Sequence, residues 1–180
     1  MKELGLDEIW WLVSPGNPLK DKARDMAPYA ARLESARLQA RRSLIRVSDF
    51  EVQASTKFTV DTIRKLKARW PGNQFIWLMG EDTVAQFHQW RRWRDLARSV
   101  PIAVLSRPGY DAEARAARAM GWLRWFVRPA SQAMNWTEWS APAITFLRLP
   151  PDRTSATQLR ALNPDWHRRF KTKQPRAAVP

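Results

Sequence analysis

Short apolar segments alternate with helical segments along most of the chain, and this alternation constrains the fold more than any other feature. The apolar segments are EIWWLV (8–13), LIRVSDFEV (44–52), QFIWLMG (74–80), PIAVLS (101–106) and ITFLRLP (144–150). Strands that are separated by helices usually pair in parallel, with right-handed crossovers between them. The sequence therefore predicts an α/β fold built on a parallel sheet, in which the continuous apolar run 8–13 is covered on both faces.

The helical segments show apolar stripes. An amphipathic helix is predicted over 27–41, with Tyr29, Leu33 and Leu38 spaced among alanines on its apolar face. The segment FTVDTIRKLKARWPG predicts another helix, with Thr59 as its N-cap.

Four tryptophans lie in the segment 122–143, for which no regular structure is predicted. We expect them to cover the sheet; they are Trp122, Trp125, Trp136 and Trp139. After the last strand, SATQLRAL predicts a short helix.

The length of 180 residues suits one domain, which we place at residues 1–167, followed by a basic tail over 168–180. The formal net charge of +14 attracts nucleotides, nucleic acids and acidic membranes alike, so the charge alone does not identify a partner.

The chain has features of a cytoplasmic protein. It contains no cysteine, which gives no sign of an oxidising compartment. Glu3, Asp7 and Glu8 lie where a signal peptide would be positively charged, and the apolar run 9–13 is too short to span a membrane.

Candidate binding residues follow the predicted strands. The carboxyl ends of parallel strands meet at one edge of a sheet, where ligands bind. The loops at this edge are SPGNPLK, GED, SRPG and TSATQLR, and they offer Lys20, the backbone at Gly80, Asp82, Arg107 and Arg160. This set suits a polyphosphate and a ribose.

Each of these loops also has a purely structural interpretation. Ser155 and Gln158 have the spacing of a capping box, although the same helix start, with Arg160 nearby, would also bind a phosphate. Lys20 either meets a phosphate or is an ordinary solvated lysine. Asp82 either accepts a hydrogen bond from a ribose hydroxyl or caps the following helix. On local grounds, Thr59 is a cap.

Several kinds of site have no support in the sequence. The only histidines, His88 and His167, lie far apart, and no cluster has metal-ligand spacing, so we predict no protein metal site. No nucleophile-elbow sequence is present. Trp90 and Trp93 are three residues apart, a spacing that places them on one helical face and favours packing over stacking on a ligand.

Taken in order, the segments GLDEIWWLVSPGNPLK, FTVDTI, FIWLMGEDTVAQFHQWRRW, IAVLSRPGY and TSATQLR closely resemble bacterial nicotinate-nucleotide adenylyltransferases, over roughly residues 4–162. The resemblance implies a Rossmann-like parallel sheet of the nucleotidylyltransferase superfamily. It also implies adenylyl transfer from ATP to nicotinate mononucleotide in NAD biosynthesis, giving nicotinate adenine dinucleotide and pyrophosphate, with Mg²⁺ accompanying the ATP.

The resemblance also implies roles for individual residues. Lys20 would meet the phosphates, and Asp82 would lie at the adenosine. Thr59 would contact nicotinate mononucleotide, and Trp90 would pack on its pyridine ring. The family's S-x-T-x-x-R signature falls on Ser155, Thr157 and Arg160, which would hold the ATP phosphates.

One family motif has no counterpart here. Members begin with a strand and helix that carry a GGSFNPxHxGH-type loop, whose histidines contact the reacting phosphates, and neither histidine of this chain can be assigned that role. We expect that this first strand and helix are missing, that Met1 is an internal methionine of a longer natural protein, and that the 180-residue chain alone is inactive or nearly so. No catalytic residue is therefore identified beyond the supporting Lys20 and Arg160.

Other functions remain open at this stage. Adenylyl transfer to another mononucleotide or to phosphopantetheine is a less suitable alternative, because HQWRRW and SRPGY resemble the enzymes that use nicotinate mononucleotide. A basic protein that binds single-stranded nucleic acid is suggested by the net charge and the 11 tryptophans, although no nucleic-acid motif is present. A non-catalytic remnant of the fold is the third alternative.

Overall fold

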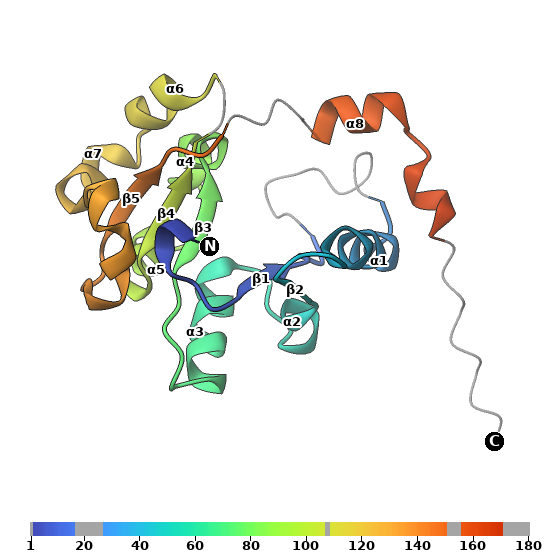
Figure 1. The fold of residues 1–180 in the computed structure, drawn as a ribbon, viewed down its shortest axis with the longest axis horizontal. Coiled ribbons are helices and arrows are strands. Elements are labelled where there is room, and N and C mark those ends of the chain that lie inside the picture. The colour runs from blue at the N-terminus through green and yellow to red at the C-terminus, as the bar shows by residue number, and fades with distance from the viewer. Residues whose placement is uncertain (1, 17–26, 107–108, 151–155, 171–180) are drawn as a thin grey trace. The chain divides into compact units, whose positions relative to one another are not determined.

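The computed structural model describes residues 2–16, 27–106, 109–150 and 156–170. The chain forms two compact units (Figure 1). One comprises Met1–Asp7 and Phe58–Arg153, and the other comprises Glu8–Lys57 and Thr154–Pro180. Within the described ranges all strand pairs are parallel, as the alternation of segments predicts, and they form one three-stranded and one two-stranded sheet.

The larger unit is built on strands β3 (Trp77–Gly80), β4 (Ile102–Leu105) and β5 (Ile144–Leu147), in the order β3-β4-β5. The central strand β4 is the most deeply buried, since Ile102, Ala103 and Val104 are 0% exposed. A parallel strand that is covered on both faces needs a continuous apolar run, which explains the composition of this segment.

Helices cover both faces of the three-stranded sheet. In this unit they are η1 (Lys2–Leu4), α3 (Thr59–Arg69), α4 (Glu81–Phe87), α5 (Trp93–Ser99), α6 (Asp111–Ala116), α7 (Met120–Leu123), η2 (Arg124–Phe126) and η3 (Ala130–Glu138). Helix α4 packs against β3, β4 and α6, whereas η1 and η3 pack against each other beside β5. The buried stripe predicted for α3 is confirmed at Val60, Ile63 and Leu66.

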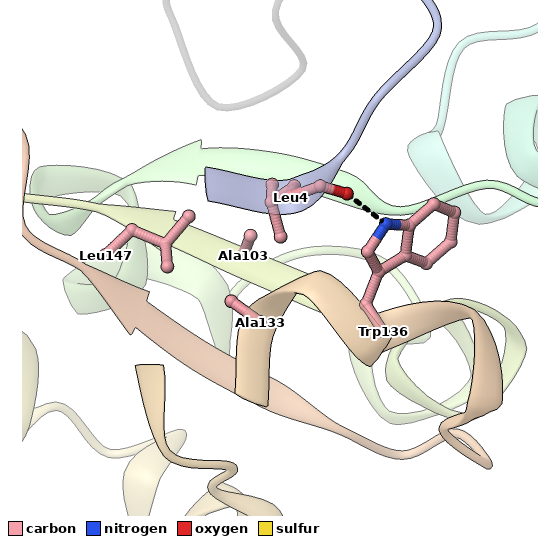
Figure 2. Close-up of a cluster of buried hydrophobic side chains, with 5 residues drawn as sticks. All are labelled: Leu4, Ala103, Ala133, Trp136 and Leu147. Carbon is pink, nitrogen blue, oxygen red and sulfur yellow. Dashed lines mark hydrogen bonds between the residues drawn. The ribbon is translucent and has the colours of Figure 1, made fainter. Parts of the chain in front are cut away.

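The face covered by η1 and η3 carries a hydrophobic cluster, which Figure 2 shows. Its members are Leu4, Ala103, Ala133, Trp136 and Leu147. The Nε1–H of Trp136 donates to the carbonyl oxygen of Leu4 at 2.8 Å. Since residues 4 and 136 are far apart in sequence, this bond fastens the N-terminal turn to the segment that precedes β5.

Replacing Trp136 by phenylalanine should lower the free energy of unfolding by about 1–3 kcal/mol, because the buried Leu4 carbonyl loses its donor. Urea denaturation followed by circular dichroism measures this loss. Trp125→Phe is the matched control, because Trp125 is 74% exposed and its replacement should change stability by no more than about 0.5 kcal/mol. Equal losses in the two variants would contradict the proposed role of the bond.

The tryptophans of segment 122–143 lie in three different environments. Trp136 and Trp139 pack on the cluster beside the sheet, as predicted. The prediction is wrong for Trp125, which projects into solvent with Arg124 beside its ring. Trp122 packs edge-to-face on Trp93 of α5, with 5.5 Å between ring centroids. Short helical turns break this segment into pieces, so that the sequence pattern does not reveal where each side chain lies.

The smaller unit contains the parallel pair β1 (Ile9–Leu12) and β2 (Ile45–Ser48). Its helices are α1 (Tyr29–Ala40), α2 (Phe50–Gln53), α8 (Ala156–Leu162) and η4 (Trp166–Arg169). The prediction that the first strand is covered on both faces is wrong, because Trp11 is 44% exposed. The predicted strand 44–52 stops at Ser48, whose hydroxyl accepts the backbone N–H of Phe50 and closes a turn into α2.

Helix α1 occupies the predicted segment, but its buried residues differ from those predicted. The fully buried residues are Ala31, Ala36 and Ala40, while Leu38, which was expected on the apolar face, is 50% exposed. The prediction for Leu38 is therefore wrong.

Candidate functional site

The carboxyl end of β3 leads directly into α4. Gly80 is the N-cap residue of α4, which begins at Glu81, and Asp82 lies in the first turn. The prediction that Asp82 caps this helix is therefore wrong. Its carboxylate lies close to Gly80, so that a Cβ atom added at Gly80 would collide with Asp82 Oδ1. The absence of a Cβ atom at Gly80 thus leaves room for the Asp82 carboxylate at this sheet edge.

Replacing Gly80 by alanine should cost about 1 kcal/mol, because the added Cβ displaces the Asp82 carboxylate. A double-mutant cycle with Asp82→Ala tests the cause, since the two costs should not add if the collision is responsible. Gly72→Ala serves as the control, because no atom lies within 4 Å of a Cβ built there. Additive costs in the cycle would contradict this explanation.

The carboxyl ends of β4 and β5 are tied together by Ser106. Its backbone N–H donates to Leu147 O at 2.9 Å, and its hydroxyl accepts the backbone N–H of Leu149 at 2.9 Å. Ser106 was not among the candidates predicted from the sequence. Its position directly after a predicted strand is the feature that could have identified it. Arg107, the candidate that follows it, lies outside the described residues.

Thr59 is the first residue of α3, and Phe58 is the N-cap residue. The prediction that Thr59 itself caps the helix is wrong by one position, because Phe58 has the extended backbone of a cap residue. Thr59 is half-buried, and within the described ranges its hydroxyl makes no hydrogen bond.

Trp90 lies in the turn between α4 and α5, not on a helix. The prediction that Trp90 and Trp93 share a helical face is wrong, although both rings contact Phe87 edge-to-face, with centroids 5.5 and 5.7 Å away. Trp90 also packs on Trp77 at 6.2 Å. These contacts fix a half-buried indole ring in a non-helical turn.

A contact between Phe58 and Arg91 links Thr59 and Trp90. The guanidinium carbon of Arg91 lies 4.6 Å from the centroid of the Phe58 ring. Phe58 precedes Thr59, and Arg91 follows Trp90. The structure therefore brings these two candidate residues into one neighbourhood, although 31 positions separate them in the sequence.

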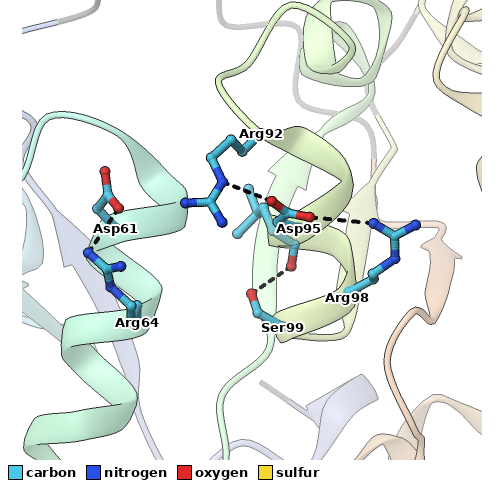
Figure 3. Close-up of polar contacts among 7 residues, drawn as sticks. Asp61, Arg64, Arg92, Asp95, Arg98 and Ser99 are labelled. Atoms are coloured by element: carbon cyan, nitrogen blue, oxygen red, sulfur yellow. Dashed lines mark hydrogen bonds and ion pairs between the residues drawn. The ribbon is translucent and has the colours of Figure 1, made fainter.

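Ion pairs lie on α3 and at the start of α5 (Figure 3). On α3, Arg64 pairs with Asp61 at 3.2 Å. At the start of α5, Arg92 donates to Asp95 at 2.8 Å, and Arg98 approaches the same carboxylate at 3.4 Å. The hydrogen bond from Arg92 lowers the pKa of Asp95. The cations of Arg64, Arg92 and Arg98 are thus paired within their own helical segments.

In the smaller unit, Arg32 joins residues that are far apart in the sequence. Its guanidinium donates to the carbonyl oxygens of Ala27 at 3.0 Å, Ser14 at 2.6 Å and Pro15 at 3.3 Å. Burial lowers the pKa of this guanidinium. Arg32, which the sequence analysis missed, therefore fastens the end of β1 to the start of α1. Lys20 lies outside the described residues.

The predicted short helix is confirmed as α8. Thr157 and Arg160 lie on it three residues apart and so share one helical face. The positions of their side chains, and Ser155 as a whole, fall outside what the structure describes. The capping box formed by Ser155 and Gln158 therefore stays a prediction.

His88 follows α4, and its Nδ1 atom is buried without a hydrogen-bond partner among the described residues. His167 lies on η4. Among the described residues, no group of three or more histidine, cysteine, aspartate or glutamate side chains could hold a metal ion. None of the helices in the described part of the chain is long and apolar enough to cross a membrane.

The comparisons with known proteins agree on one family. The cytidylyltransferase-like family matches residues 1–162. A protein of Erythrobacter litoralis named "Probable nicotinate-nucleotide adenylyltransferase" is 51% identical over 172 residues, which is 96% of this chain and 78% of that protein. A protein of the same name from Parvibaculum lavamentivorans is 46% identical over 160 residues, covering 89% of this chain and 79% of the relative.

Among solved structures, the fold resembles Plasmodium falciparum nicotinic acid mononucleotide adenylyltransferase. The structure of that enzyme complexed with NaAD has a TM-score of 0.60 at 14% identity, covering 89% of this chain and 72% of the other. A second structure, complexed with APC, has a TM-score of 0.59. At this identity the likeness establishes the fold alone, and it confirms the predicted parallel α/β architecture.

Proposed function

The chain belongs to the nicotinate-nucleotide adenylyltransferases of the cytidylyltransferase-like family, and from this membership we propose that it transfers the adenylyl group of ATP to nicotinate mononucleotide in NAD biosynthesis. The products are nicotinate adenine dinucleotide and pyrophosphate. The observation that carries the proposal is the identity to the E. litoralis relative, which extends over nearly the whole chain. We place the reaction in the cytoplasm, with which the absence of cysteine is compatible.

Thr59 and Trp90 are the proposed contacts to nicotinate mononucleotide. The contact between Phe58 and Arg91 supports this assignment, because it places both residues in one neighbourhood. An indole ring held by Trp77 and Phe87 offers a rigid surface for stacking on a pyridine ring. The hydroxyl of Thr59 would supply a polar contact to the same substrate.

The proposed ATP contacts are Lys20, Asp82, Ser155, Thr157 and Arg160. The carboxylate of Asp82, which lies at the carboxyl edge of a parallel sheet, is suited to accept hydrogen bonds from the adenosine ribose. The cationic Lys20 and Arg160 would offset the negative charge of the triphosphate. ATP enters as its magnesium complex, in which Mg²⁺ is held mainly by substrate phosphates and water.

The chemistry requires positioning more than a reactive side chain. A phosphate oxygen of the mononucleotide attacks the α-phosphorus of ATP, and the bond from that phosphorus to the bridging oxygen breaks. Pyrophosphate leaves with the bonding electron pair. The role of the protein is to align the two phosphates and to stabilise the negative charge that develops on them.

Equilibrium binding distinguishes this function from nucleic-acid binding. Titration of the endogenous protein with nicotinate mononucleotide, followed by tryptophan fluorescence, should show saturable quenching that a 20-mer of single-stranded RNA does not compete away. Binding to the RNA alone, with an affinity that falls steeply as salt rises, would contradict the proposal.

A further inference from the structure

Three aromatic side chains that are assigned to no substrate gather where α7 ends and η2 follows it. The ring of Trp122 packs on that of Phe126, with 4.9 Å between centroids. Trp125 lies between them in the sequence and is 74% exposed, and Val127 is 44% exposed. Such a group of exposed apolar side chains on a protein surface marks an interaction site.

Guanidinium groups lie over two of these rings. The guanidinium carbons of Arg94 and Arg98, both on α5, lie 5.9 and 5.2 Å from the centroid of the Trp122 ring. That of Arg124 lies 5.1 Å from the centroid of the Trp125 ring. A guanidinium in this position can still donate the N–H groups of its own plane to an anion. The tryptophan–arginine surface, as we call it, consists of these three arginines with Trp122, Trp125 and Phe126.

The positive charge of the tryptophan–arginine surface is not balanced by acidic side chains. Within the part of the chain that the structure describes, Arg94 and Arg124 make no ion pair. Arg98 pairs with Asp95 at 3.4 Å. The sequence has no acidic residue over positions 114–137, which include all of α7 and η2. A partner that covers this surface must therefore carry negative charge.

Single-stranded nucleic acid offers both a flat ring and a negative charge in every nucleotide. Its bases stack on aromatic side chains, and its phosphates bind arginines. An acidic peptide would neutralise the arginines but would not offer a ring at each residue, and in a duplex the bases already stack on one another. Since cellular DNA is mostly duplex, RNA is the single strand available to such a surface.

We propose that the tryptophan–arginine surface binds single-stranded RNA, in addition to the proposed function and independently of it. A base stacks on the exposed ring of Trp125, and phosphates bind the guanidinium groups of Arg94 and Arg124. Trp122 acts differently, because its ring lies under Arg94 and Arg98 and supports them. None of these residues is assigned to ATP or to nicotinate mononucleotide.

The test uses the protein as its source cell makes it. Binding of a fluorescein-labelled oligouridylate of about 12 nucleotides, which is within the usual range of site sizes, is followed by fluorescence anisotropy at several salt concentrations. Trp125→Ala should weaken binding about 10-fold without changing the salt dependence, because it removes a stacking surface and no charge. Arg94→Gln combined with Arg124→Gln should make the slope of log K against log salt shallower by about 1.4, or about 0.7 for each phosphate contact.

Arg37→Gln combined with Arg64→Gln is the matched control. It removes the same charge, but from exposed arginines that pair with carboxylates on their own helices, at 3.6 and 3.2 Å. The affinity should change by no more than about 2-fold and the salt slope should stay the same. A saturating concentration of nicotinate mononucleotide should not displace the RNA from the wild-type protein.

The inference would be overturned if the wild-type protein did not bind the RNA, or if nicotinate mononucleotide displaced it. Unchanged affinity in Trp125→Ala would assign the RNA to another surface, such as the basic tail. Equal binding of a duplex RNA of the same length would exclude stacking on bases. A homodimer that dissociates in Trp125→Ala, measured by sedimentation, would show that a second copy of the chain covers the surface. Each of these results would leave the proposed adenylyl transfer standing, because that activity is measured separately.

Discussion

Replacing Arg160 by alanine, in the protein as its source cell makes it, is expected to lower kcat/KM for ATP by about 10²–10³-fold. This is the usual cost of losing one donor that stabilises transition-state charge. Lys20→Ala should have an effect of similar size. In our account, both cations contact phosphate groups whose charge is redistributed as the bond to pyrophosphate breaks. Steady-state kinetics with varied ATP measure the loss, and melting temperatures measured in parallel show whether the fold is intact.

The control for Arg160 is Arg168→Ala, which removes an exposed arginine of the same unit, paired with Asp165 at 3.1 Å. Exposed ion pairs of this kind contribute no more than about 1 kcal/mol, so neither activity nor stability should change much. If Arg160→Ala lost stability and activity in equal measure, the capping interpretation of the α8 start would be favoured over phosphate binding.

Trp90→Ala should lower kcat/KM for nicotinate mononucleotide by about 100-fold, because stacking of a base on an aromatic ring contributes about 1–3 kcal/mol. The KM for ATP should change far less, since Trp90 is assigned only to the mononucleotide. Trp90→Phe keeps a stacking surface and should recover part of the loss. Initial rates with each substrate varied in turn provide the measurement.

Trp125→Ala removes an exposed tryptophan of the same unit and controls for any general effect of losing an indole ring. A fall in ATP use equal to the fall in mononucleotide use would show that Trp90 supports the fold of the turn between α4 and α5. Its assignment as a stacking residue would then be wrong.

Most of the fold can be predicted from the sequence, because the spacing of apolar residues and the composition of each segment indicate whether it forms a helix or a strand. The core positions of β3, β4 and β5 follow from continuous apolar runs, and the α3 stripe follows from helical spacing. Errors arise where a tertiary contact or a turn decides the outcome. The strand predicted over 44–52 ends at Ser48, for example, because the serine hydroxyl accepts the backbone N–H of Phe50 and closes a turn into α2.

The candidate site likewise has some features that the sequence predicts and others that only the structure shows. The sequence places Thr59 at the start of a helix, but it puts Trp90 on a helical face instead of in a turn, and it cannot show that Phe58 and Arg91 meet. The cap roles predicted for Thr59 and Asp82 fail because each helix begins one or two residues earlier than the pattern suggests. Arg32 carries no motif, and only its hydrogen bonds to Ala27, Ser14 and Pro15 reveal it.

The most direct test of adenylyl transfer follows the phosphorus atoms. The endogenous protein is incubated with nicotinate mononucleotide and magnesium ATP labelled with ³²P at the α- or the γ-phosphate, and the products are separated by chromatography. If the protein transfers the adenylyl group, the α-label appears only in nicotinate adenine dinucleotide and the γ-label only in pyrophosphate. The two labelled products form in equal amounts. A folded protein that releases labelled inorganic phosphate, or forms no labelled dinucleotide, would contradict it.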